Sequence, residues 1–402
     1  MINNRSLGRA LLGTGALALT LSLAATASTA GGHPRITVPT LTGWASLPAA
    51  TFVLGSEPSG AKATGNTNGF PVPFDDQPIQ GFSGIVNNGD GSFDVLSDNG
   101  YGNQANSADF LLRIQRLAPA FASNRVDVVG GITLSDPNSR VPWALTRADR
   151  VLTGADFDVE SIVKGGDGTY WLGDEFGPYL LHFDRAGRLL SAPVPTPGVI
   201  APEQAARTGL PATTISSKGF EGLAGSPDGR HLYGLLEGTV AGDTPGELRF
   251  NEFDVRDQRF TGQVYKYPLG SPDLAIGDAI AVDSNRFLII ERDGGQGSTA
   301  VVKRIYLADK RDRNHDGLMD KTLVADLMKI ANPRRLAGFD TTFTFPFQTI
   351  EDVVILDDHR IAVLNDNNFP FSSGRTPNAA DNNEWITVEL PDSLHADRRL
   401  IK

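Results

Sequence analysis

Short apolar runs separated by turn residues recur along this chain, and their alternating pattern predicts β-hairpins rather than helices. The clearest hairpin lies within residues 156–190, where two apolar runs flank the turn Gly165–Gly168. Acidic residues stand at both of its open ends, Glu160 at the start and Asp174 and Glu175 at the finish. Because the two strands are antiparallel, these ends lie side by side, and like charges placed so close repel each other.

The same hairpin occurs five times. Its copies span residues 81–100, 158–177, 219–238, 276–295 and 349–368. Repeats of this kind are typical of solenoids and propellers. Each step along the chain leaves room for a second, outer hairpin, and candidate outer strands occur at residues 180–183, 247–253 and 301–306. Four strands per repeat predict an all-β protein, a β-propeller of four-stranded blades.

We expect six blades, with five or seven as alternatives. The sixth would combine Phe52–Leu54 with the strand Trp385–Val388 and so close the ring. Two insertions interrupt the repeat, at residues 193–217 and 308–347, and the second contains a short helical pattern at Leu323–Ile330. Long loops of this kind commonly shape the binding face of a propeller.

The first 30 residues have the pattern of a secretory signal peptide, which leaves residues 31–402 as a single propeller domain. Arg5 and Arg9 precede an apolar run at residues 10–25, and small residues follow it. No later segment approaches the roughly 20 apolar residues that a membrane span needs. We therefore expect a protein exported to the periplasm or the medium, with no membrane span, and we expect it to be a monomer.

The formal net charge is −11, and the chain has no cysteine. An acidic surface argues against nucleic acid as a partner. It also disfavours a bare polyanionic substrate, unless a bound cation reverses the local field. Without disulfides, stability must come from a large core or from bound metals, and a chain of 402 residues can bury such a core.

In a propeller, the first strands line the central channel, so the start of each first strand and the end of each second strand meet on one face. The acids gathered there would be Asp98, Asp158, Glu160, Asp174, Glu175, Glu221, Glu237, Asp278, Glu291, Glu351 and Asp366. They cannot all stay ionised without a counter-charge. Oxygen ligands without cysteine favour Ca²⁺. The predicted ligands are Glu160, Glu221, Glu351, Asp366, Asn365 and Asp98. Solvated strand ends are the alternative.

A second Ca²⁺ signal is independent of this ring. Residues 312–320 fit the first nine positions of a Ca²⁺-binding loop, D-x-N-x-D-G-x-x-D. The side-chain ligands predicted in this loop are Asp312, Asn314, Asp316 and Asp320. Leu323 occupies the position at which an EF-hand has its bidentate glutamate, and a polar turn without a metal is the alternative.

Nucleophile motifs are weak, so the sequence favours attack by water. Ser83 lacks the second glycine of a nucleophile elbow, and no histidines form a metal-binding or catalytic motif. A channel metal would activate the water. Asp174 or Glu175 is the predicted general base, and Lys218 and Arg292 would steady the leaving or transferred group.

The repeats resemble the phytase-like domain family, which is described by an esterase-like activity of phytase. The matching segments are residues 82–84 with 96–98, 158–161 with 174–179, 219–224, 290–292, and 351–352 with 365–369. The resemblance covers roughly residues 78–390. It implies a secreted propeller that hydrolyses phosphate or carboxylate esters. The acidic D-D-P-A and N-N-x-D-V-R motifs of the β-propeller phytases are not matched.

These features predict a secreted, Ca²⁺-dependent hydrolase of a small-molecule ester or phosphate, acting at an acidic channel mouth. Two alternatives stay open. One is a non-catalytic propeller that Ca²⁺ stabilises and that serves in binding or as a scaffold. The other is a sugar-lactone hydrolase, a class of propeller that also holds a channel metal with carboxylate and asparagine ligands.

Overall fold

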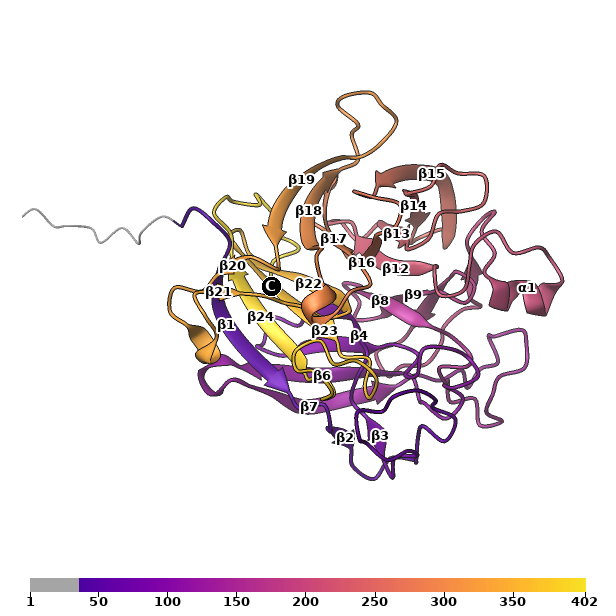
Figure 1. Cartoon of the computed structure of the whole chain (residues 1–402). Helices are drawn as coiled ribbons and strands as arrows, with labels where there is room; N and C mark the ends of the chain where they lie inside the picture. The colour runs from indigo at the N-terminus through magenta and orange to yellow at the C-terminus, as the bar shows by residue number, and fades with distance from the viewer. Residues whose placement is uncertain (1–35) are drawn as a thin grey trace, which may run out of the picture. The chain divides into compact units, whose positions relative to one another are not determined.

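The computed structural model describes residues 36–402, so the predicted signal peptide, residues 1–30, lies outside the described residues. These residues form an all-β fold of four-stranded antiparallel units (Figure 1). The all-β prediction is therefore confirmed.

Each unit continues along the chain from its first strand to its fourth. Unit I contains β4 (Phe82–Asn87), β5 (Phe93–Ser97), β6 (Arg113–Ala120) and β7 (Arg125–Thr133). Unit II contains β8 (Val159–Lys164), β9 (Tyr170–Asp174), β10 (Tyr179–Phe183) and β11 (Val194–Pro195). Unit III contains β12 (Phe220–Gly225), β13 (His231–Leu236), β14 (Glu247–Asp254) and β15 (Arg259–Pro268). Unit IV contains β16 (Ala275–Ala281), β17 (Arg286–Arg292), β18 (Lys303–Asp309) and β19 (Asp320–Asp326).

Unit V joins the two ends of the described chain. It contains β22 (Thr349–Asp357), β23 (Arg360–Asp366), β24 (Asn383–Glu389) and β1 (Thr40–Leu47). The first strand of the fold, β1, is thus the outer strand of its last unit, where it runs antiparallel to β24. The hairpin between the first two strands was predicted for all five units, and the outer strands β10, β14 and β18 lie where they were expected.

A few short elements lie outside the five units. They are β2 (Phe52–Val53) with β3 (Gln77–Pro78), β20 (Ile330–Ala331) with β21 (Thr342–Phe343), α1 (Pro202–Thr208), and 3₁₀ turns at Phe121–Ser123, Gly297–Thr299 and Leu336–Gly338. Across residues 36–402, no helix has the length and apolar character needed to cross a membrane.

Two expectations about the ends and insertions are wrong. Phe52 and Val53 do not pair with Trp385–Val388, because β2 pairs with β3 whereas β24 pairs with β23 and β1. Units II, III and IV are separate four-stranded sheets, whereas units I and V join through the β1–β7 pair into one ten-stranded sheet that also includes β20 and β21. The helical pattern at Leu323–Ile330 belongs instead to β19, the following turn and β20, because pairing with β18 satisfies the backbone of this segment.

The five first strands lie side by side in a closed cycle. β4 contacts β8, β8 contacts β12, β12 contacts β16, β16 contacts β22, and β22 contacts β4. Figure 1 shows these five strands at the centre of the fold, with the outer strands of each unit further from the centre. The fold is therefore propeller-like.

Every first strand is interrupted by a β-bulge at the same place. The pairing of the first and second strands skips the residues Ser83 and Gly84, Glu160, Glu221, Gly277 and Glu351. A bulge inserts an extra residue, bends the strand and redirects its side chain. The repeated bulge therefore sets the position from which each unit presents a side chain at one end of the cycle.

The residue after the bulge ties neighbouring units together. Asp278 accepts a hydrogen bond from the Val353 amide at 3.0 Å, so it joins unit IV to unit V. Asp352 accepts one from the Gly84 amide at 2.8 Å and joins unit V to unit I. Ser161 donates to the Phe220 carbonyl oxygen at 3.4 Å, from unit II to unit III. The first strands are thus positioned by bonds between units.

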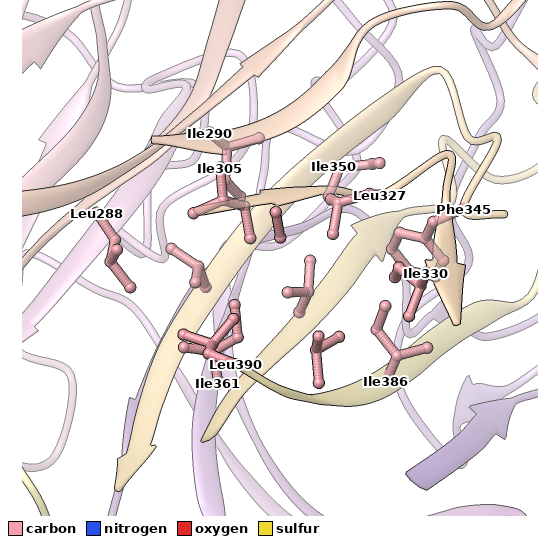
Figure 2. Close-up of a cluster of buried hydrophobic side chains, with 14 of the residues drawn as sticks. Leu288, Ile290, Ile305, Leu327, Ile330, Phe345, Ile350, Ile361, Ile386 and Leu390 are labelled. Atoms are coloured by element: carbon pink, nitrogen blue, oxygen red, sulfur yellow. The ribbon is translucent and has the colours of Figure 1, made fainter. Parts of the chain in front are cut away.

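Apolar side chains fill the spaces between units. The largest cluster joins units IV and V, with Leu288, Ile290 and Ile305 on one side and Ile350 and Ile361 on the other, all buried (Figure 2). Full burial of one such side chain stabilises a fold by about 1.5–3 kcal/mol. This packing fixes the angle between neighbouring units and so supports the cycle of first strands.

The bond between units V and I gives a stability prediction. Asp352→Ala should lower the free energy of unfolding by about 1–3 kcal/mol, because it leaves the buried Gly84 amide without its acceptor. Urea unfolding measures the change. Asp273→Ala, at an exposed aspartate, is the matched control. Equal stability of the two variants would mean that the bond between units contributes nothing.

Candidate functional site

Two positions of each unit place side chains at the same end of the cycle. One is the bulge residue of the first strand, which is Ser83, Glu160, Glu221, Gly277 or Glu351. The other lies at or just past the end of the second strand. It directly follows the residue that pairs with the last first-strand residue before the bulge, and it is Asp98, Glu175, Glu237, Arg292 or Asp366. We call these ten residues, together with Asp158 beside Glu160 and Glu175, the acidic ring, and we call the second set its end residues. Ser83 donates to Glu351 at 3.0 Å, so residues of different units meet there.

Unit II carries the most acid of the five. Asp158 lies opposite Glu175, and its carbonyl oxygen accepts the Glu175 amide at 2.9 Å. Asp158, Glu160 and Glu175 are all buried, and each places one carboxylate oxygen within 4.8 Å of the other two. Asp158 Oδ1 and Glu175 Oε1 are buried without a hydrogen-bond partner among residues 36–402. Buried polar atoms normally have partners, so these oxygens are positioned to receive a cation.

Unit IV differs from the other four because its two ring positions supply an arginine and no carboxylate. Its bulge residue is Gly277, where a Cβ would lie 1.9 Å from the Ile350 carbonyl oxygen, so the closeness of unit V excludes a side chain. Its end residue is Arg292, which contacts Glu351 at 2.9 Å and Glu221 at 3.3 Å. It also contacts Glu237 at 3.3 Å, so one guanidinium is shared by three carboxylates.

Lys218 is the second basic group near the ring. It forms an ion pair with Glu237 and keeps 32% of its side chain exposed, compared with 11% for Arg292. It directly follows the insertion at residues 193–217, which was expected to shape the mouth. The hydroxyl of Ser217, the last residue of this insertion, lies 3.4 Å from Asp158 Oδ2. The insertion therefore reaches the acidic ring, and Lys218 is the cation that solvent can approach.

Burial raises the pKa values of the ring carboxyls, and their mutual repulsion adds to this effect. Burial, followed by the negative charge of Asp158, raises the pKa of Asp98 to about 8. Burial raises the pKa of Asp158 to about 6. The pKa values of the other affected ring carboxyls are also raised, chiefly by burial: Glu160, Glu175, Glu221, Glu351 and Asp366. The ring therefore carries more potential negative charge than Arg292 and Lys218 balance.

Several predicted site residues are engaged elsewhere. Asp174 accepts the Asp158 and Gly177 amides at 2.9 and 2.8 Å, so both of its oxygens hold the backbone of unit II. Asn365 donates to two carbonyl oxygens and accepts the Glu384 amide at 2.7 Å. Glu291 accepts from Tyr267 at 2.7 Å and pairs with Lys321. These three side chains support the fold next to the ring.

The predicted ring gives Asp278 the position that Gly277 occupies in the structure. Alignment by residue type matched it with Glu160 and Glu221, but the bulge of unit IV falls at Gly277. Asp278 is therefore equivalent to Asp352, and both accept backbone amides of the next unit. A shift of one residue reverses the side to which a strand residue points, and the sequence pattern does not report where a bulge lies.

The predicted Ca²⁺ loop connects β18 to β19, at the end of β18 away from Arg292, because Asp309 pairs with Arg286 at the start of β17. Asp312 accepts the Asp316 and Gly317 amides, each at 3.0 Å. The other two acids of the loop also accept main-chain amides, Asp316 from Leu318 and Asp320 from Arg313, each at 2.8 Å. The loop is thus separate from the acidic ring.

The other end of the first strands has a cavity with both apolar and ionisable side chains. A cavity of about 640 Å³ is lined there by residues of all five units, among them Ile85, Ile162, Leu223, Ile280 and Val353. The same cavity is also lined by Lys164, Asp167, His182, Asp228 and His231. Within residues 36–402, the groups of buried carboxylates close enough to share a metal lie at the acidic ring.

The fold and the ring together define the class of protein, an all-β propeller-like protein with buried carboxylates at one end of its first strands. The chain belongs to the family described as "Phytase-like: Esterase-like activity of phytase", which it matches over residues 77–369. The family expected from the repeats is thereby confirmed.

Individual relatives are distant. An uncharacterized secreted protein of Arthroderma benhamiae is 33% identical over 113 residues, which are 24% of this chain and 22% of that protein. Among solved structures, a GH43 β-1,3-galactosidase has 10% identity and a TM-score of 0.43, covering 83% of this chain and 60% of its own. A luciferin-regenerating enzyme has 11% identity and a TM-score of 0.35, covering 78% of each chain.

The raised pKa values predict how stability depends on pH. A carboxyl with a raised pKa binds its proton more tightly in the folded state, so its contribution is fully present below its unfolded pKa of about 4. That contribution is lost as the pH rises to the folded value, which is about 8 for Asp98. In a chelator, the free energy of unfolding should therefore fall as the pH rises between these values. The fall is about 1.4 kcal/mol per pH unit for each carboxyl that is protonated in the folded state and ionised in the unfolded state.

Urea unfolding at a series of pH values, with a chelator and with Ca²⁺, measures this dependence. Asp98→Asn removes one titrating group and should make the fall shallower, and Ca²⁺ should do the same. Stability in the chelator that stays level or rises between pH 4.5 and 8 would contradict this account of the ring.

Proposed function

We propose that this protein is a secreted, Ca²⁺-dependent ester hydrolase whose site is the acidic ring. The observation that carries the proposal is the group Asp158, Glu160 and Glu175, whose oxygens lie within 4.8 Å of one another. Two of these buried carboxylates have an oxygen without a partner among the described residues. Carboxylate oxygens without nitrogen or sulfur ligands suit Ca²⁺ better than zinc or copper.

We further infer that the five units are the blades of a five-bladed propeller. The closed cycle of contacts between β4, β8, β12, β16 and β22 supports this count. So does unit V, in which β1 completes the last sheet and joins the ends of the described chain. On this reading, the acidic ring surrounds one mouth of the central channel.

Secretion rests on two observations. The first 30 residues have the pattern of a signal peptide. The relative from Arthroderma benhamiae is named as a secreted protein. Ca²⁺ is abundant outside cells, where sites of modest affinity fill.

The geometry favours attack by water over a covalent intermediate. Ser83, the one hydroxyl of the acidic ring, donates to Glu351, and the ring contains no histidine to activate it. A bound Ca²⁺ would polarise the ester oxygen and make a bound water more acidic. Asp158, Glu160 and Glu175 would hold the Ca²⁺. Glu175 would then be a metal ligand and not the general base.

Asp98 is our candidate for the general base. It comes from the unit next to unit II, and the charge of Asp158 contributes to its raised pKa. A carboxylate with a raised pKa accepts a proton more readily near neutral pH. Asp174, the other predicted base, has both oxygens bonded to backbone amides, so its role would be to hold Asp158 and the following turn.

The test of hydrolysis is a substrate panel. The purified protein should hydrolyse at least one class among phosphomonoesters, phytate, carboxylic esters and lactones when Ca²⁺ is present, and a chelator should abolish the activity. Glu160→Gln should lower kcat/KM at least about 100-fold without changing the circular dichroism spectrum, because it removes a ligand charge. Glu389→Gln, away from the ring, is the matched control.

Activity of Glu160→Gln equal to that of the control would show that the metal is held elsewhere. No turnover of any substrate at any Ca²⁺ concentration would contradict the enzymatic proposal. That outcome would favour the alternative of a binding or scaffold propeller that Ca²⁺ stabilises.

Lys218 gives a test of substrate charge. It is the ring-side cation with the larger exposed fraction, 32% of its side chain, so we expect it to receive an anionic group of the substrate. Lys218→Met should raise KM for an anionic ester about tenfold and leave KM for a neutral ester unchanged. Equal changes for both esters would mean that Lys218 only balances Glu237.

A further inference from the structure

Arg292 has the opposite charge to every equivalent residue of the fold. The end residues of the other four units are Asp98, Glu175, Glu237 and Asp366. Unit IV supplies no bulge carboxylate of its own, because its bulge residue is Gly277. The guanidinium therefore reaches the carboxylates of its two neighbours, Glu221 and Glu237 of unit III and Glu351 of unit V.

Two of these carboxylates, Glu221 and Glu237, belong to a second group with the geometry of a cation site. Glu175, Glu221 and Glu237 each place an oxygen within 4.8 Å of the other two, and all three are buried. The group shares Glu175 with the first one. Arg292 contacts two of its three members, each at 3.3 Å.

The arrangement around Arg292 differs from that of a residue that waits for a substrate. Only 11% of its side chain is exposed, and its contacts with Glu351, Glu221 and Glu237 occupy the guanidinium. Burial by itself lowers the pKa of Arg292, but the charges of Glu237, Glu351 and Glu221 raise it above its usual value. A guanidinium stays charged under all ordinary conditions and offers several donors to carboxylates.

We propose that Arg292 is a tethered cation that takes the place of a second divalent ion in the group Glu175, Glu221 and Glu237. Loss of the guanidinium would leave Glu221 without its counter-charge and Glu237 with Lys218 alone, and a divalent cation would compensate this group of buried carboxylates. Removal of Arg292 should therefore open one additional divalent-cation site. For the first ion, held by Asp158, Glu160 and Glu175, this inference rests on the proposed function.

The inference also limits the chemistry of the ring. A guanidinium balances charge and donates hydrogen bonds, but unlike a metal ion it cannot coordinate a water molecule. The side of the ring at units III to V would therefore be fixed by Arg292, and metal-dependent chemistry would be confined to the side at unit II. Glu175, which belongs to both groups, lies between the two cations.

Equilibrium dialysis with radioactive Ca²⁺ tests the proposal, because it counts bound ions without reference to activity. Arg292→Met should bind one Ca²⁺ more per chain than the wild-type protein. Arg147→Met, at a surface arginine paired with Glu57 and Asp149, should bind the same number as the wild type. All proteins carry Asp312→Asn and Asp316→Asn, so that the β18–β19 loop does not add to the count. An unchanged count in folded Arg292→Met would overturn the proposal.

Glu237→Gln in the presence of Arg292 tests the proposal if Arg292→Met fails to fold. The count should stay at its wild-type value, because Arg292 and not a metal occupies this group. Loss of one bound ion would overturn the proposal, since it would make Glu237 a metal ligand. If the wild type bound no ion at the ring and Arg292→Met bound one, the metal of the proposed function would be refuted, while the tethered-cation inference would stand.

Discussion

Repulsion among buried carboxylates is the constraint on which the account of this protein depends. The fold brings acids from four of its units to one end of the first strands, where burial and mutual repulsion raise their pKa values. Two cations lie among the carboxylates of the ring: Arg292 contacts Glu221, Glu237 and Glu351, and Lys218 contacts Glu237. At unit II, the same constraint is left unbalanced, and buried oxygens of Asp158 and Glu175 lack partners among the described residues. This asymmetry is the reason that we propose a cation site at unit II.

The geometry of the ring depends on the repeated bulge and on the bonds that join the units. The bulges place Glu160, Glu221 and Glu351 at the shared end of the cycle, and in units II, IV and V the next residue fixes the strand against its neighbour. Asp278, Asp352 and Ser161 make these bonds between units. The apolar clusters between units then hold the arrangement from the outside (Figure 2). An error of one residue in the first strand of unit II, III or V would turn a carboxylate of the ring to the other side of its strand.

The sequence predicts the repeat, the hairpins and the family well, because turn residues and alternating apolar residues are local signals. It predicts less about features that pairing decides. Leu323 lies in a strand although the segment has a helical pattern, since β18 supplies its partner. Trp385 joins unit V and not a sixth sheet, because β1 returns from the start of the fold to complete that unit. Gly277 shows no signal in the sequence, and the role of Arg292 depends on contacts between three units.

The proposed function is that of a hydrolase that acts through one metal at the unit II side of the acidic ring. Anomalous scattering from a crystal grown with Ca²⁺ and measured at a long wavelength tests this account most directly. The account predicts an anomalous peak surrounded by oxygens of Asp158, Glu160 and Glu175, at about 2.3–2.6 Å from each. Anomalous signal at the loop of residues 312–320 alone, with none at the acidic ring, would contradict it.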